Sequence, residues 1–282
     1  MANQHKRTPQ DACLLCKIGP STKKNSHIFS KFWVKNMIIT DNNQREGWLL
    51  STTPNKHKKL GVRVQDSPKQ DYLFCPECES RFGVLERYVA NHLYNRFREQ
   101  NATQDFPITR GKEQEVDHLT ALKVDPIMFK LFIYSFVWRA SVSTHLVFNN
   151  FKLPLEVEEP LREVLDKFLK DTEPNTLSYI QKHASEFPHL PMNIVTTEVA
   201  TNATSNFLQP LLDTVNGKVL LYANEFIVFL YPDWNAPRQG GQAYNLADSP
   251  LTISFVSQQD WNQLHHMFID YLSGISDKVN MG

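Results

Sequence analysis

Helical periodicity is clearest in the segment that follows the second pair of cysteines. Between Glu77 and Gln100, apolar residues recur at spacings of three and four, as they do on one face of a helix. Gly83 weakens one turn without interrupting the pattern. We therefore predict one amphipathic helix that begins beside these cysteines. Its apolar face consists of Phe82, Leu85, Val89, Leu93 and Phe97.

Three further helices are predicted in the middle of the chain. The first starts at Asp125-Pro126 and is apolar on almost every side (IMFKLFIYSFVWRASVSTHLVF), which is typical of a helix buried in the core. An amphipathic helix follows from about Glu158 to Asp171, with Pro160 tolerated in its first turn. The segment Thr176–Glu186 is expected to form the third helix.

Beyond Pro188 the pattern changes to short apolar runs that are typical of strands. A last helix, Gln258–Leu272, is expected to end before Gly274, which suits the position just after a helix end. The predicted strands are Asn193–Val199, Gly217–Tyr222, Glu225–Tyr231 and Leu251–Val256.

These elements indicate an α+β protein in two parts. Residues 1–105 form the first part. Residues 119–282 form a domain that is helical over 119–187, strand-rich over 190–257 and closed by a helix over 258–273. The chain has 282 residues, 41% of them hydrophobic, which is enough to bury a sizeable core.

The apolar runs are too short for a membrane protein. The longest, Leu131–Trp138, has 8 residues, well short of the ~20 that a membrane-spanning helix needs. The first ten residues (MANQHKRTPQ) lack the apolar region of a secretory signal. We therefore expect a cytoplasmic protein with no membrane partner.

Charge is unevenly distributed along the chain. Residues 1–100 contain 17 Lys and Arg against 9 Asp and Glu, a balance of +8, so that residues 101–282 carry −8 in a chain of net charge zero. A basic first third suggests a surface that binds a polyanion, most commonly a nucleic acid. Mutual attraction between the two parts of the chain is the alternative.

The four cysteines form two CxxC pairs that are typical of one tetrahedral zinc site. The pairs are Cys13–Cys16 and Cys75–Cys78, separated by 58 residues. A CxxC turn, a strand-rich middle and a second CxxC at the start of a helix form the outline of a treble-clef zinc fold. We therefore predict a structural Zn²⁺ held by all four thiolates, which would contribute directly to folding.

The order of motifs around these cysteines resembles a group of bacterial proteins related to HNH endonucleases. The shared features are the first CxxC, Ser26-His27-Ile28 followed by Lys31-Phe32, Phe74-Cys75 with Cys78-Glu79, Arg81-Phe82 and Glu86-Arg87-Tyr88. The segment Ser135–Ser143 (SFVWRASVS) is also similar to a motif of that group. The resemblance thus extends over most of the chain and implies an N-terminal treble-clef/ββα (HNH-like) module. Some relatives of HNH enzymes act in anti-phage defence.

The resemblance assigns roles to several residues of the first part. His27 matches the histidine that activates water, and Glu79 matches a metal-binding position on the helix. Such a site would use Mg²⁺ or Mn²⁺ to hydrolyse DNA phosphodiesters. We expect nucleic-acid contacts from basic residues near this site, namely Lys31, Lys56, Lys58 and Lys59.

This sequence also departs from the HNH pattern. Ser26 stands where many HNH enzymes have a metal-binding Asp, and Gly83 leaves the next helical turn without a ligand. Glu86 follows Glu79 by seven residues, about 10 Å along a helix, which is too far for both to ligate one ion easily. Ser26 and Glu86 are therefore secondary candidates only.

Ordinary structural roles remain open for each candidate. His27 could be a hydrogen-bonded core histidine, and Glu79 could stabilise the dipole of its helix. Glu86 could pair with a neighbouring base such as Arg87 or Arg81. The lysines could simply be solvated.

Two functions follow from the sequence. The first is a metal-dependent DNA nuclease of HNH type, possessing a structural zinc and a catalytic Mg²⁺ or Mn²⁺. The second is an inactive zinc module that binds nucleic acid or a partner protein. In either case, residues 119–282 are available to contact a protein partner or to form a homo-oligomer.

Overall fold

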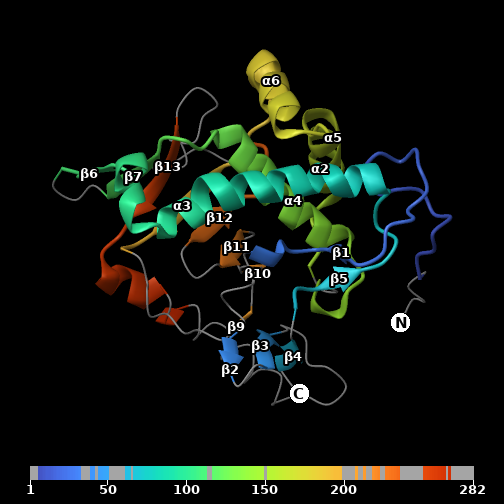
Figure 1. Cartoon of the computed structure of the whole chain (residues 1–282), viewed down its shortest axis with the longest axis horizontal. Helices are drawn as coiled ribbons and strands as arrows, with labels where there is room; N and C mark the ends of the chain where they lie inside the picture. Colours follow the sequence, from blue (N-terminus) through green and yellow to red (C-terminus); the bar gives the residue numbers. More distant parts are fainter. Residues whose placement is uncertain are drawn as a thin grey trace.

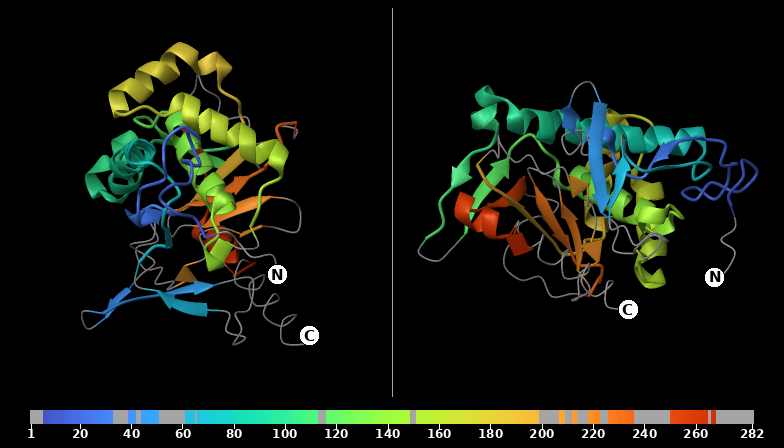
Figure 2. Two further views of the ribbon diagram at one scale, coloured as in Figure 1. Left: turned by 90° about the vertical axis from the view of Figure 1, so that its right-hand side faces the viewer. Right: turned by 90° about the horizontal axis from the view of Figure 1, so that it is seen from below.

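The fold is a mixed sheet covered by helices, with one apolar helix, α4 (Pro126–Val142), at its centre (Figures 1 and 2). It is seen in a computed structural model of the chain. The structure describes residues 6–32, 39–41, 44–50, 61–64, 66–112, 116–148, 151–198, 207–208, 212–213, 218–222, 226–235, 250–264 and 266–267.

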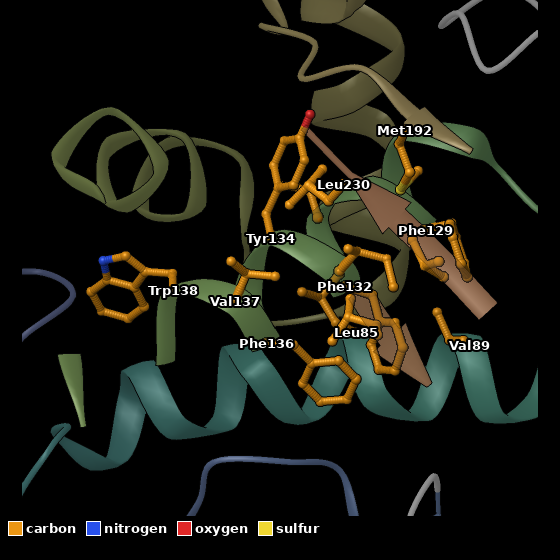
Figure 3. Packing of buried hydrophobic residues seen from close by; sticks show 14 of the residues in the cluster. Leu85, Val89, Phe129, Phe132, Tyr134, Phe136, Val137, Trp138, Met192 and Leu230 are labelled. Atoms are coloured by element: carbon orange, nitrogen blue, oxygen red, sulfur yellow. The ribbon is translucent and has the colours of Figure 1, made fainter. Parts of the chain in front are cut away.

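Helix α4 is the core helix that the sequence predicts. The Asp125 carboxylate accepts a hydrogen bond from the Met128 N–H at 2.9 Å and so caps the helix, and Pro126 occupies the first turn. Every residue from Pro126 to Ser141 is buried, as expected for a helix that is apolar on all sides. α4 packs between α2 and the sheet (Figure 3).

The helix beside the second cysteine pair is confirmed, with one irregularity. Helix α2 (Pro76–Val89) continues through a π-helical turn, η1 (Ala90–Tyr94), into α3 (Asn95–Arg98). The predicted apolar face is buried at Phe82, Leu85, Val89 and Leu93. The wider π turn is a local adjustment that the periodicity did not indicate.

The next helix begins earlier than predicted. Helix α5 (Leu155–Phe168) contains Pro160 in its interior rather than in its first turn. Pro160 has no N–H for the carbonyl of Glu156, four residues earlier. That carbonyl instead accepts a hydrogen bond from the indole Nε1 of Trp234 at 3.2 Å. A distant tryptophan thus satisfies the backbone group that the proline leaves free.

The remaining helices of this region are short. Helix α6 (Glu173–His183) is capped by the Thr172 hydroxyl and continues into the 3₁₀ turn η4 (Ala184–Glu186). Two further 3₁₀ turns are η2 (Gln100–Asp105) and η3 (Leu146–Phe148). The chain is again helical over 258–264; the predicted end of that helix, at Gly274, lies outside the described residues.

The main sheet has seven strands in the order β10-β11-β12-β8-β13-β7-β6. Neighbouring strands are antiparallel except for β8 and β13, which run parallel. All four strands predicted beyond Pro188 are present, whereas the two edge strands, β6 and β10, and the inner strand β7 were not predicted. The strands are β6 (Ile108–Thr109), β7 (Asp117–Ala121), β8 (Met192–Thr196), β10 (Leu212–Asp213), β11 (Val219–Tyr222), β12 (Ile227–Leu230) and β13 (Leu251–Phe255).

Two smaller sheets involve the first part of the chain. β1 (Ser26–His27) pairs with β5 (Lys69–Gln70) in antiparallel fashion. The other sheet is formed by β2 (Ile39–Asp41), β3 (Gln44–Leu50), β4 (Gly61–Val64) and β9 (Phe207–Leu208). β9 adds in parallel to β3, so a segment from the second part of the chain completes a sheet of the first.

One contiguous hydrophobic core joins the cysteine-bearing segments to the sheet. In Figure 3, Leu85 and Val89 of α2 lie on one side of α4, and Met192 and Leu230 of the sheet lie on the other. Within the part of the chain that the structure describes, we find no helix that is both long and apolar enough to cross a membrane.

Candidate functional site

The two CxxC pairs come together in one cluster. The four sulfur atoms lie within 4.8 Å of one another, and three of the four cysteines are buried, Cys16 being half-buried. Tetrahedral zinc with bonds of 2.3 Å would bring them to about 3.8 Å apart. The cluster could therefore hold a metal ion such as zinc, as the sequence predicts, after a small contraction. It comprises Cys13, Cys16, Cys75 and Cys78.

Tight backbone geometry shapes the first pair. The Cys13 N–H donates to the Gly19 carbonyl at 2.7 Å, and the Lys17 N–H donates to the Cys13 carbonyl at 2.9 Å. Lys17 has φ 61°, the left-handed conformation that closes such a turn. At the second pair, Cys75 is the N-cap of α2 and is followed by Pro76. Each pair thus sits on a rigid backbone feature.

The cluster favours a thiolate at Cys13 and neutral thiols at Cys75 and Cys78. A hydrogen bond from the Cys78 thiol, together with backbone N–H groups, lowers the pKa of Cys13 to about 4. The same hydrogen bond raises the pKa of Cys78, and burial raises the pKa of Cys75 to about 11. Close thiols therefore share protons that a dication would displace, which fits the donor set of a metal site.

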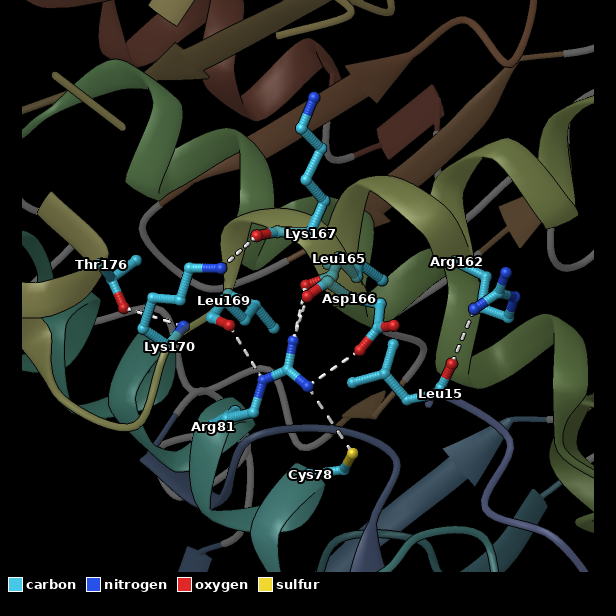
Figure 4. Close-up of polar contacts among 10 residues, drawn as sticks. All are labelled: Leu15, Cys78, Arg81, Arg162, Leu165, Asp166, Lys167, Leu169, Lys170 and Thr176. Carbon is cyan, nitrogen blue, oxygen red and sulfur yellow. Dashed lines mark hydrogen bonds and ion pairs between the residues drawn. The ribbon is translucent and has the colours of Figure 1, made fainter. Parts of the chain in front are cut away.

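Two arginines tie the cysteine cluster to α5 (Figure 4). Arg81 pairs with Asp166 at 2.9 Å, and its Nη1 lies 3.8 Å from the Cys78 sulfur. Arg81 also donates to main-chain carbonyls at the end of α5, including that of Leu169 at 2.9 Å. Arg162 of α5 donates to the carbonyl of Leu15, between the first two cysteines, at 2.8 Å. Both CxxC segments are thus bonded to α5.

His27 lies on β1, beside the cluster, in a polar environment. Its ring is half-buried, and Nδ1 lies 2.5 Å from the hydroxyl of buried Ser67. Asp66 accepts hydrogen bonds from the Ser67 N–H at 2.8 Å and from the Lys69 ammonium at 2.5 Å. The His27 ring is therefore held in place by Ser67, Asp66 and Lys69. None of these three residues was singled out from the sequence.

The environment keeps the His27 imidazole neutral. Burial lowers its pKa below the usual 6.5, and the positive charges of Lys69 and Arg139 add to this effect. The negative charges of Glu86 and Asp66 oppose it without reversing it. A neutral imidazole at pH 7 can accept a proton, which is what a general base requires.

Glu79 lies in the first turn of α2, where its charge also favours the helix dipole. Its Oε2 atom is buried without a hydrogen-bond partner among the described residues, as are the hydroxyls of Ser26 and Ser30. Burial raises the pKa of Glu79, although Arg139 and the nearby Ser26 hydroxyl oppose this. Buried polar atoms without partners call for water or an ion.

His27 and Glu79 are near each other without direct contact. Successive residues of a strand point to opposite faces, so the buried Ser26 side chain and the His27 ring diverge. In the part of the chain described here, no hydrogen bond joins the His27 and Glu79 side chains. Both groups feel the charges of Arg139 and Glu86.

Glu86 has a different partner from the neighbours expected. It pairs with Arg139 of α4 at 2.9 Å rather than with Arg87 or Arg81, and Arg139 is only 1% exposed. At Gly83, between the two glutamates on the helix, an added Cβ would meet nothing within 4 Å. The helix therefore has open space at this turn, and Glu86 is already engaged by a cation.

The expected nucleic-acid contacts are only partly described. Lys31 is exposed, whereas Lys56, Lys58 and Lys59 lie outside the described residues. Lys23 and Lys24, just before β1, are also exposed. Exposed positive charge therefore flanks β1 along the chain.

A separate cavity of about 420 Å³ lies at the ends of the parallel strands β8 and β13. Its lining is mainly apolar, with Phe97, Phe106 and Phe255, and includes the carboxylate of Glu198. It shares no lining residue with the cysteine cluster or with β1. This cavity is therefore distinct from the candidate site.

Comparison with known proteins found no matching family model, no similar curated protein and no similar solved structure. The functional argument therefore depends on the residues of this chain alone.

Proposed function

We propose that the protein is a metal-dependent nuclease of HNH type that hydrolyses DNA phosphodiesters, with His27 as its general base. The observation that carries the proposal is the setting of His27. It lies on the first strand of an antiparallel pair, β1–β5, that is followed along the chain by helix α2 bearing Glu79. Two paired strands followed by a helix support the ββα interpretation of the sequence, with β2, β3 and β4 inserted between the two strands.

His27 is suited to accept a proton from water. In the form that acts as a base, the Nδ1–H donates to the Ser67 hydroxyl, which fixes the ring and leaves the Nε2 lone pair for catalysis. In the proposed reaction, a water molecule donates a proton to Nε2 as its oxygen bonds to phosphorus. The bond from phosphorus to one sugar oxygen breaks, and that leaving oxygen takes a proton from solvent water. Because burial lowers the pKa of His27, the accepting form predominates at neutral pH.

Glu79 and Ser26 offer oxygen ligands that suit Mg²⁺ or Mn²⁺. One Glu79 carboxylate oxygen and the Ser26 hydroxyl have no partner among the described residues. Such ions commonly use one or two carboxylates and complete their coordination with water and substrate phosphate. The bound ion would stabilise the charge that develops on the phosphate and on the leaving oxygen.

The cysteine cluster would hold a structural Zn²⁺. Its role is to fix the start of α2, and hence Glu79, because Cys75 and Cys78 lie at that helix end. In this proposal Lys31 and the segment containing Lys56, Lys58 and Lys59 bind DNA phosphates. The resemblance to defence-associated HNH relatives supports a cytoplasmic role against phage.

The test is nicking of supercoiled plasmid by the purified protein with Mg²⁺ or Mn²⁺. Wild type and the His27→Ala variant are compared after zinc content shows that both retain the cluster. The proposal predicts cleavage by wild type alone. Equal cleavage by both proteins would remove His27 from the mechanism.

One observation favours a non-catalytic alternative. Arg139 already neutralises Glu86, and Gly83 provides no ligand, so of the helix positions that the resemblance indicates only Glu79 is left for a catalytic ion. A zinc module that binds nucleic acid or a partner protein would need no such ion. It would bind DNA in a salt-sensitive manner and cleave none.

A further inference from the structure

Arg139 makes a long-range polar connection to His27. Its Nη1 donates to the main-chain carbonyl of His27, 112 residues earlier, at 2.7 Å and to Glu86 at 2.9 Å. Its Nε donates to the Ser135 carbonyl at 3.2 Å. The guanidinium also lies over the ring of Phe82, 5.0 Å from its centre. One side chain therefore joins α4 to both β1 and α2.

The end of α4 also holds the strand that pairs with β1. The Ser143 hydroxyl and the Thr144 N–H donate to the Gln70 side-chain oxygen at 2.8 and 2.9 Å. The Gln70 amide donates in return to the Thr144 hydroxyl at 2.8 Å. Because Gln70 lies on β5, both strands of the β1–β5 pair are anchored to one segment, the end of α4 and the residues that follow it.

We propose that Arg139 is a positioning residue, which holds the backbone of His27 at a fixed place relative to α2 so that the ring can serve as general base. This inference rests on the proposed nuclease function. It explains why a cation that is 1% exposed is retained, since burying a charge is costly unless its partners repay the cost. Nη1 donates to the His27 carbonyl and to Glu86 while Nε donates to the Ser135 carbonyl, and the single nitrogen of lysine cannot reproduce this fork of donors.

The proposal predicts a specific kinetic loss. Arg139→Gln should lower kcat for plasmid nicking by about 100-fold, because a small displacement of a catalytic group costs that much, and should leave KM nearly unchanged. Arg139→Lys should recover part of the loss. Trp138→Phe, in the same turn of α4 but packed on Phe74 and Phe82, is the control for a change in helix packing and should keep kcat within about 3-fold of wild type.

An NMR titration of His27 tests the connection between Arg139 and His27 and does not depend on nuclease activity. Four charged groups affect this ring: Lys69 and Asp66 near β5, Glu86 on α2 and Arg139 on α4. Arg139→Gln should raise the pKa of His27, Glu86→Gln should lower it, and Trp138→Phe should leave it unchanged. If Arg139→Gln fails to fold, the pKa of His27 in Glu86→Gln and in Arg139→Lys is the test of the connection instead.

The outcomes separate the two proposals. Absence of cleavage by wild type would overturn the nuclease function, and with it the role of Arg139 as a positioning residue for a base. Cleavage by wild type with equal kcat in Arg139→Gln and Trp138→Phe, and no change in the His27 titration, would overturn the inference about Arg139 alone.

Discussion

The guanidinium of Arg139 and the main-chain carbonyl of His27 are 2.7 Å apart although 112 residues separate them in sequence. The contact places the end of the most buried helix against the strand that carries the candidate base. The cysteine cluster secures the start of α2, and Arg139 secures the middle of that helix through Glu86. The local geometry of His27 therefore depends on the whole fold.

Loss of one cysteine should remove the metal and destabilise the protein. We expect wild type to contain one zinc per chain and Cys75→Ser to contain none, because three thiolates leave tetrahedral coordination incomplete. The Tm should fall by about 10 °C or more. Elemental analysis and thermal unfolding measure both effects, with Lys17→Ala in the exposed turn as the control. A wild-type protein that binds no zinc would contradict this prediction.

Removing the Ser67 hydroxyl should weaken catalysis while preserving the fold. Ser67→Ala deletes the partner of His27 Nδ1, so the ring loses its fixed orientation. Loss of such a supporting hydrogen bond typically costs 10–100-fold, and we expect a decrease of about that size in nicking rate. Ser254→Ala, which deletes a hydroxyl bonded to Asn193 in the sheet, is the matched control. Equal rates in the two variants would argue against a catalytic role for the Ser67–His27 pair.

Stability should decrease as the pH falls through about 6.5. The pKa of His27 is lower in the folded protein than in the unfolded chain, so below pH 6.5 the unfolded chain binds a proton that the folded protein does not. The free energy of unfolding should therefore fall with pH and level off below the folded pKa. Urea unfolding between pH 5 and 8 should show that the free energy of unfolding changes less steeply with pH in His27→Gln than in wild type. Burial lowers the pKa of His145 as well, so part of the slope should remain. Identical slopes in both proteins would contradict the prediction.

The hydrogen bond from Trp234 to Glu156 should matter only because Pro160 is present. We expect Trp234→Phe to cost up to about 1 kcal/mol of unfolding free energy, since the Glu156 carbonyl loses its donor. In a Pro160→Ala background the new N–H can serve that carbonyl, and the same substitution should cost less. Denaturant unfolding of the four proteins measures the coupling. Equal costs in both backgrounds would show that the indole N–H has no such role.

The elements and the cysteine cluster were predictable because their signals are local. CxxC spacing identified the four cysteines that cluster, and periodicity located α2, α4 and four strands of the main sheet. The position of Pro160 was missed because the compensating donor, Trp234, is 78 residues away. The edge strands β6 and β10 were missed because each is only 2 residues long, and β7 was missed because three of its 5 residues (DHLTA) are polar.

The residues that hold His27 in place were harder to predict from the sequence. Glu86 was expected to pair with a neighbouring arginine on its own helix, yet Arg139 binds it, because the packing of α4 on α2 decides which cation is within reach. The segment Ser135–Ser143, singled out by its resemblance to a family motif, was the only signal that pointed to Arg139. No spacing rule relates Ser67 to His27, 40 residues earlier.

Chemical rescue of His27 tests the central claim most directly. His27→Gly should retain zinc and bind plasmid DNA but fail to nick it, and added imidazole should restore nicking in proportion to the concentration of its neutral form. Recovery by imidazole, absent in Glu79→Ala treated in the same way, is the result that the account predicts. Full nicking by His27→Gly without imidazole would contradict the assignment of His27 as the general base.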